Sequence, residues 1–273
     1  MLNKRILTPY EKNQLLKYGI DIKKLLNTDA PVEYVTGHVD FLGLNLLVSP
    51  DVLIPRVETE ELVKMAVEQV ENTQILNKTF QIVDVGTGSG AIVISITKKL
   101  SQNFAKKSRF EVTGLDISKD ALMIAEKNLS KINREIKIDG EKSVNIRLPI
   151  KFAQSDLLSQ WDSTKKIDLI VANLPYIPSD RIEKLDNSVK DFEPHLALDG
   201  GPDGLNLVRK LLKQAENMIS KNGVILLELD ITHTQEKMKE FEDEWKIEIV
   251  ESKLGGVNFG VLSLIKLIDK VNT

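Results

Sequence analysis

The residues best suited to chemistry are the tetrapeptide Asn173-Leu174-Pro175-Tyr176, which follows the apolar run 167–172. We expect a buried strand to end there, with an amide side chain, backbone carbonyls restricted by a proline and an aromatic ring side by side. The oxygen of Asn173 and a backbone carbonyl can accept the two hydrogens of a planar NH2 group, while Tyr176 stacks on its plane. Such a clamp aims the nitrogen lone pair at an electrophile. A tight turn capped by the asparagine is the alternative.

A glycine loop, Gly86-Thr87-Gly88-Ser89-Gly90, follows another apolar run and opens a predicted helix. Its glycines let backbone NH groups and the helix N-terminus come close to an anionic group. The pattern by itself fits either a dinucleotide phosphate or the methionine carboxylate of S-adenosylmethionine, and a plain structural turn is a third interpretation. A hydride-transfer enzyme has no use for an amide clamp. The two motifs together therefore favour S-adenosylmethionine as cofactor and methylation of an amide or exocyclic amine.

Two other predicted strand ends offer cofactor ligands. Asp116 follows the strand near 110–115 and can accept hydrogen bonds from both ribose hydroxyls, although it or Ser118 is alternatively the N-cap of the next helix. Asp156 and Leu157 follow the strand near 150–154, where they can meet the adenine amino group and ring. A capped loop is the alternative for this pair.

Composition limits the class of protein. The 273 residues carry a net charge of −3, which argues against binding of nucleic acid by counterion release, and we expect no stable nucleic-acid binding. The chain has no cysteine, and its three histidines lie far apart in sequence, so we assign no metal. No apolar leader and no segment of about 20 apolar residues are present, so we expect no membrane association and a cytoplasmic protein.

The elements that must position these motifs alternate from residue 81 onward. We predict strands near 81–85, 110–115, 150–154, 167–172, 223–229, 246–251 and 259–267, and helices near 90–101, 118–131, 205–220 and 232–243. This order predicts an α/β fold with a mostly parallel seven-stranded sheet and ligands at the carboxyl ends of its strands. The short link at Gly255-Gly256 makes the last strand antiparallel. That arrangement is typical of Rossmann-like class I S-adenosylmethionine-dependent methyltransferases.

The first 55 residues have a different character. Apolar spacing predicts two short helices within 9–27, and a β-hairpin turns near Gly43. A helix then starts after Pro55, with acidic residues in its first turn. We therefore predict a small helical and hairpin domain over residues 1–55 and a methyltransferase domain over residues 56–273. Residues 133–149 are expected to form a surface insertion, and the irregular stretch 193–204 either closes over the substrate or is a structured surface loop.

Motifs spread over most of the chain resemble the protein-(glutamine-N5) methyltransferases that modify peptide-chain release factors. They are the stretches 31–37, 53–60, the glycine loop, the Asn-Leu-Pro-Tyr box, 192–194, 197–198 and 200–205. The resemblance implies that Asn173, Leu174, Pro175 and Tyr176 hold the glutamine of a Gly-Gly-Gln motif. We assign Asn173, Pro175 and Tyr176 to catalysis, and Asn173 also contacts the cofactor. The N-terminal domain is implied to help dock the release factor.

The sequence departs from that family in four places, one of which is the stretch 227–230, where the glycine that commonly follows the strand is missing. Leu174 stands where the box usually has a first proline, and Val57 replaces the second proline of the usual Pro-Arg-Pro-Glu-Thr stretch. The segment before Pro31 is shorter than the helical domain of the family. Alternative functions are methylation of adenine N6 or another exocyclic amine of nucleic acid, methylation of a glutamine in a ribosomal protein, and a non-catalytic module that kept the cofactor pocket.

Overall fold

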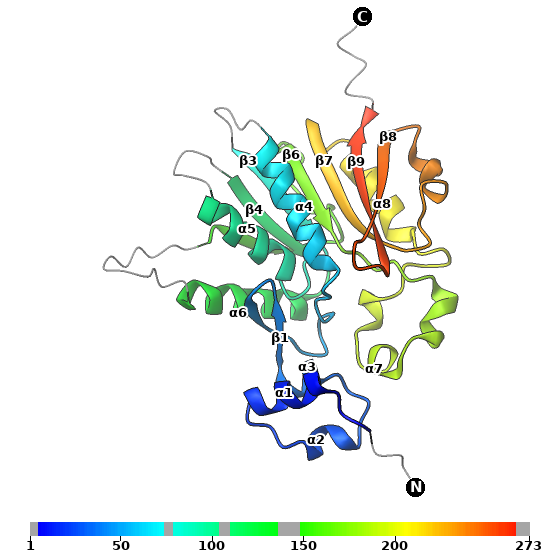
Figure 1. The fold of residues 1–273 in the computed structure, drawn as a ribbon. Coiled ribbons are helices and arrows are strands. Elements are labelled where there is room, and N and C mark those ends of the chain that lie inside the picture. Colours follow the sequence, from blue (N-terminus) through cyan, green and yellow to red (C-terminus); the bar gives the residue numbers. More distant parts are fainter. Residues whose placement is uncertain (1–4, 74–78, 104–109, 136–147, 266–273) are drawn as a thin grey trace, which may run out of the picture.

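The computed structural model describes residues 5–73, 79–103, 110–135 and 148–265 (Figure 1). These residues form a seven-stranded sheet of order β5-β4-β3-β6-β7-β9-β8. The strands are β3 (Phe80–Val85), β4 (Phe110–Asp116), β5 (Ile150–Gln154), β6 (Ile167–Ala172), β7 (Ile219–Asp230), β8 (Trp245–Glu251) and β9 (Val257–Leu264). Pairs from β5 to β7 are parallel, and β9 is antiparallel to both of its neighbours. The predicted sheet is confirmed, with its antiparallel strand inserted between β7 and β8.

Helices cover both faces of the sheet, and alternate side chains of the central strands face them. On β6, Leu169 and Val171 pack in one buried cluster with α4 (Thr59–Asn72), α5 (Ala91–Asn103) and α6 (Lys119–Glu135). Ile170 and Ala172 point the other way, into a cluster with α8 (Asn206–Ala215). Successive residues of a strand face opposite sides, so a strand covered on both faces is mostly apolar. This is why the run 167–172 could be recognised in the sequence. Asp168 is the exception in β6, where it accepts hydrogen bonds from the backbone NH of Gln81 and from the Ser220 hydroxyl.

Two predicted helices differ from the structure. The helix predicted over 205–220 ends at Ala215 in α8, because Ile219 already pairs with Ile167 at the start of β7. The helix predicted over 232–243 is wrong, since only a short 3-10 turn, η3 (Lys237–Phe241), forms there. The side chain of Asn258 donates to the carbonyls of Ile231 and His233, at 3.0 and 3.4 Å. Those carbonyls are thereby diverted from helical hydrogen bonds.

The N-terminal region consists of three short helices and a hairpin within residues 5–48. The helices are α1 (Pro9–Lys17), α2 (Lys23–Leu26) and α3 (Val32–Thr36), of which α3 was not predicted, and the strands are β1 (His38–Phe41) and β2 (Leu44–Leu47). Thr8 and Glu11 form a capping box that starts α1. The hairpin turns at Leu42-Gly43 with positive φ at both residues, as a two-residue loop of type I′ requires.

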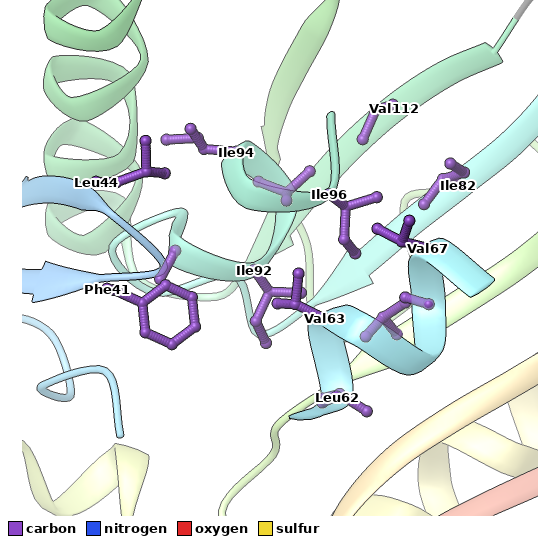
Figure 2. Packing of buried hydrophobic residues seen from close by; sticks show 14 of the residues in the cluster. Phe41, Leu44, Leu62, Val63, Val67, Ile82, Ile92, Ile94, Ile96 and Val112 are labelled. Carbon is purple, nitrogen blue, oxygen red and sulfur yellow. The ribbon is translucent and has the colours of Figure 1, made fainter. Parts of the chain in front are cut away.

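The hairpin shares its core with the large sheet. Figure 2 shows Phe41 and Leu44 beside Ile92 and Ile94 of α5, and all four are buried in one cluster. Buried Asn128 of α6 adds a polar link. Its amide accepts from the backbone NH of Leu47 at 2.7 Å and donates to the Leu47 carbonyl at 3.0 Å. The hairpin is thus fixed against the helices that follow the glycine loop, and a boundary at residue 55 remains a prediction.

The predicted insertion at 133–149 falls largely outside the described residues. Its first residues belong to α6, which continues to Glu135, and residues 136–147 are not described. The side chain of Asn133 accepts from the backbone NH of Leu148 at 3.0 Å. Of the helices in the described ranges, none combines the length and apolar character that a membrane crossing requires.

Candidate active site

A cavity lies at the carboxyl ends of β3, β4, β5 and β6 and encloses about 1140 Å³ of empty space, part of it open to solvent. Its lining includes most of the predicted site residues: Gly86, Thr87, Gly88, Ser89, Asp116, Asp156, Leu157, Asn173, Leu174 and Pro175. Four parallel strands therefore bring motifs from distant parts of the chain to one edge of the sheet, as expected. Gly90 and Tyr176 do not line this cavity.

The three glycines of the loop meet different surroundings, although all have positive φ. A Cβ on Gly88 would find nothing within 4 Å, so this residue offers its backbone to open space. A Cβ on Gly90 would lie 3.2 Å from the Cβ of Ala125 and 3.1 Å from Ile94. Gly90 is therefore required for the close packing of α5 on α6, and Gly88 for backbone access to the cavity.

Two carboxylates hold the loop in place. Buried Asp84 accepts a hydrogen bond from the Thr87 hydroxyl at 2.6 Å, and burial raises the pKa of Asp84 to about 7. Asp116 accepts from the backbone NH of Gly88 and of Ser118, both at 2.8 Å. Ser118 accepts from the NH of Ala121 at 3.2 Å and so occupies the N-cap position of α6. Ser118 is therefore the helix cap, whereas Asp116 lines the cavity and holds the glycine loop through Gly88.

The residues after β5 form a polar rim and an apolar wall. Asp156 pairs with Lys210 of α8, with 2.5 Å between its Oδ2 and the lysine Nζ. This partner was not predicted from the sequence. Leu157 lines the cavity with φ +54, a left-handed conformation that is unusual for a residue with a branched side chain. Unfavourable backbone conformations of this kind concentrate at binding sites.

The amide of Asn173 has a defined orientation. The β6–β7 register pairs Ala172 with Leu227, so the next residues, Asn173 and Glu228, fall side by side on the α4 face. The Nδ2 of Asn173 donates to Glu228 Oε1 at 2.9 Å and to the Thr59 hydroxyl at 3.2 Å. Both N–H groups of the amide thus have protein partners, which leaves its oxygen as the group available to a ligand.

Tyr176 and Glu228 do not line the cavity, but Glu228 is hydrogen-bonded both to Tyr176 and to Asn173, which does line it. Tyr176 is half-buried, and its hydroxyl donates to Glu228 Oε1 at 3.1 Å. Glu228 is 2% exposed, and burial raises its pKa to about 7. Sequence reasoning gave Glu228 no role in the site. The available signal was a carboxylate inside the apolar run 224–229, because a charged residue in a buried strand is seldom there without a partner.

The irregular stretch 193–204 reaches the cavity. Pro194, Leu196 and Ala197 line it, and Leu196, in the short turn η2 (His195–Ala197), keeps 62% of its surface exposed. Buried Glu193 anchors the start of the stretch through an ion pair with half-buried Arg56 and accepts from the NH of Ile54 at 3.3 Å. The segment before α4 and the stretch 193–204 are therefore joined at the cavity mouth.

Two of the three histidines contact groups that explain them without a metal. His38 stacks on Tyr18 with ring centroids 4.4 Å apart, and buried His233 lies with its Nε2 3.0 Å from the carbonyl oxygen of Asp203. Within the described part of the chain, no three His, Asp or Glu side chains are grouped as metal ligands would be. The arrangement as a whole can hold an extended cofactor along the strand ends and a planar amide beside Asn173.

Comparison with known proteins identifies the family. Residues 76–257 match the family described as Methyltransferase domain. The release factor glutamine methyltransferase of Clostridium acetobutylicum is 36% identical over 89% of this chain and 77% of its own length. The chain belongs to the release factor glutamine methyltransferase family. The predicted family and the prediction of a methyltransferase are thereby confirmed.

Relatives in this family differ in how much of their length is matched. The enzyme of the same name from Koribacter versatilis is 35% identical over 73% of this chain, but the match spans 62% of that relative. A solved methyltransferase structure from Pyrococcus furiosus superimposes with a TM-score of 0.50 at 13% identity, covering 93% of this chain and 98% of that one. This likeness concerns the fold alone, and it agrees with the predicted class I methyltransferase fold.

Proposed function

We propose that the protein transfers a methyl group from S-adenosylmethionine to the side-chain amide nitrogen of the glutamine in the Gly-Gly-Gln motif of a peptide-chain release factor. The nitrogen attacks the methyl carbon, the carbon–sulfur bond breaks, and S-adenosylhomocysteine leaves. The methylated nitrogen then loses one proton to water or to a neighbouring acceptor. No strong base is needed before attack, so the protein contributes mainly orientation.

The observation that carries this proposal is the orientation of Asn173. Its oxygen is the free acceptor, because Thr59 and Glu228 take both hydrogens of its Nδ2. An acceptor beside Pro175 at the cavity wall suits an NH2 group with two hydrogens to donate. Relatives that are 35–36% identical and bear the name release factor glutamine methyltransferase make a glutamine amide the NH2 group we favour.

The cofactor is assigned to the other part of the cavity. The loop at Gly86 and Gly88 lies beside the methionine part of the cofactor in this proposal, Asp116 accepts from the ribose hydroxyls, and Asp156 with Leu157 contacts the adenine. Each of these residues lines the cavity. The NH groups of the two glycines already donate to the Leu115 carbonyl and to Asp116, so these glycines contribute close approach of the backbone and no free donor. A carboxylate oxygen can accept two hydrogen bonds, so the bonds that Asp116 already accepts from Gly88 and Ser118 leave it capacity for a ribose.

The release factor is proposed to dock across the N-terminal domain, residues 1–55, and the stretch 193–204. Both contribute to the mouth of the cavity, through Val52 and Leu53 on one side and Pro194 and Leu196 on the other. Release factors work on ribosomes, and we therefore place the reaction in the cytoplasm. We expect no stable complex with nucleic acid, in keeping with the net charge of −3.

Methyl transfer from labelled cofactor tests the proposal. The purified protein is incubated with a release factor of its own organism, with the same factor carrying Asn in place of the motif glutamine, with ribosomal proteins and with nucleic acid. We expect label in the first sample and background in the others. Label in a ribosomal protein or in nucleic acid, with none in the release factor, would replace the proposed substrate by one of the alternatives.

A further inference from the structure

Glu228 is hydrogen-bonded to the two polar side chains of the Asn-Leu-Pro-Tyr box, Asn173 and Tyr176. Its Oε1 accepts from Asn173 Nδ2 at 2.9 Å and from the Tyr176 hydroxyl at 3.1 Å. Its other oxygen, Oε2, is buried and has no hydrogen-bond partner among the described residues. A buried ionised carboxylate with an unpaired oxygen costs stability, and a group retained at such a cost often has a functional role.

The orientation of an amide depends on what faces it. If the Asn173 amide turned over, its oxygen would lie against Glu228 Oε1, and two acceptors at about 2.9 Å would repel each other. Its NH2 group would then point at the cavity, where it would oppose the hydrogens of a substrate amide. Thr59 supports the same orientation, because its hydroxyl donates to Glu228 and therefore accepts from Asn173. The carboxylate thus selects the orientation both directly and through Thr59.

We propose that ionised Glu228 is a positioning residue that keeps the Asn173 oxygen turned toward the substrate NH2 group, and that protonation of Glu228 releases this orientation. A protonated carboxyl can donate to the Asn173 oxygen, so both orientations of the amide become allowed. This inference rests on the proposed function for its kinetic consequences. The hydrogen bonds on which it stands are independent of the substrate.

The charge state of Glu228 can change near neutral pH. Burial raises the pKa of Glu228 to about 7, and Glu58 at the start of α4 raises it further, whereas bonds from Thr59, Tyr176 and Asn173 lower it. On the neighbouring strand, β9 places Phe259 opposite Glu228, and this side chain does not titrate. Arg56 and Asp230 are the other charges that act on Tyr176. Turnover is therefore expected to rise with pH through about 7.

The first test compares wild type with Glu228→Gln. The variant has nearly the same shape and no charge, and its amide can donate to the oxygen of a turned Asn173. We expect kcat to fall roughly 10- to 100-fold with the affinity for S-adenosylmethionine unchanged, and the rise in kcat near pH 7 to vanish. The melting temperature at pH 8 should equal or exceed that of wild type, because the variant has no buried ionised carboxylate. Unchanged kcat, or a retained pH rise, would overturn the inference.

A second variant should shift the rise of kcat with pH toward higher pH. Tyr176→Phe removes one hydrogen bond to the carboxylate and keeps the ring, so the pKa of Glu228 should increase and the rise in kcat should shift to higher pH. A shift to lower pH, or no shift in a variant of normal stability, would contradict the role of Glu228.

Nitrogen NMR supplies a readout that requires no activity. The side-chain NH2 signals of Asn173, identified by their loss in Asn173→Ala, should titrate with a midpoint near 7 in wild type and be independent of pH in Glu228→Gln. A wild-type protein that titrates in this way but methylates no release factor would refute the proposed function and leave the positioning contact standing. An active wild type whose Asn173 signals do not titrate would refute the positioning role alone.

Discussion

The variant Gly90→Ala should have a lower free energy of unfolding, although residue 90 does not line the cavity. Gly90 has φ +80, and a left-handed conformation costs an L-residue roughly 1–2 kcal/mol. The added Cβ would also lie 3.2 Å from the Ala125 Cβ, closer than ordinary contact, and overpacking of this kind costs about 1–3 kcal/mol. The sum is a loss of about 2–5 kcal/mol in the free energy of unfolding.

Gly88→Ala is the matched control. Its φ is +54, so the conformational cost is similar, but a Cβ there would meet no atom within 4 Å. This variant should lose about 1–2 kcal/mol of stability. It should lose more affinity for S-adenosylmethionine than Gly90→Ala does, because the new methyl group occupies the space a ligand needs.

Urea unfolding and calorimetric titration with S-adenosylmethionine measure the two effects. We expect opposite rankings in the two measurements: Gly90→Ala is the less stable variant, and Gly88→Ala binds S-adenosylmethionine more weakly. Equal losses of stability, or a Gly90→Ala protein with normal stability and no cofactor binding, would refute the division of roles between the two glycines.

Three other variants test separate contacts. Asp116→Asn keeps the shape but donates where Asp116 accepts, and titration should show cofactor binding weakened by roughly 1.5–3 kcal/mol; unchanged affinity would reduce Asp116 to an organiser of the loop. Asn173→Ala should lower kcat about 100-fold with cofactor affinity nearly intact, and an equal loss of both would make the residue structural. Asn128→Ala leaves the Leu47 backbone groups unsatisfied and should lower the free energy of unfolding by about 2–4 kcal/mol, whereas a loss below 1 kcal/mol would mean that the hairpin is held by apolar packing alone.

The sheet and its ligand-binding edge were predictable because apolar strands end at recognisable motifs. Gly86 and Asp116 each come at the end of an apolar segment whose length fits a buried strand. Parallel strands place their carboxyl ends at one edge of the sheet. That rule alone brings together residues such as Gly86, Asp116, Asp156 and Asn173.

Contacts fixed by register or by loops could not be predicted in the same way. Glu228 reaches Asn173 only because β6 and β7 pair with Ala172 opposite Leu227, a detail that no spacing along the chain reveals. The turn after β7 depends on Asn258, almost thirty residues further on, whose side chain binds carbonyls that a helix would have used. Tertiary contacts of this kind override local helical periodicity.

The most direct test of the central claim is peptide mapping by mass spectrometry. The organism's own release factor, incubated with this protein and S-adenosylmethionine, should gain the mass of one methyl group on the peptide that contains the Gly-Gly-Gln motif. Fragmentation should place that methyl group on the glutamine side chain, and Asn173→Ala should abolish most of the signal. A methyl group on any other residue, or an unmodified release factor beside a methylated ribosomal protein, would contradict the account.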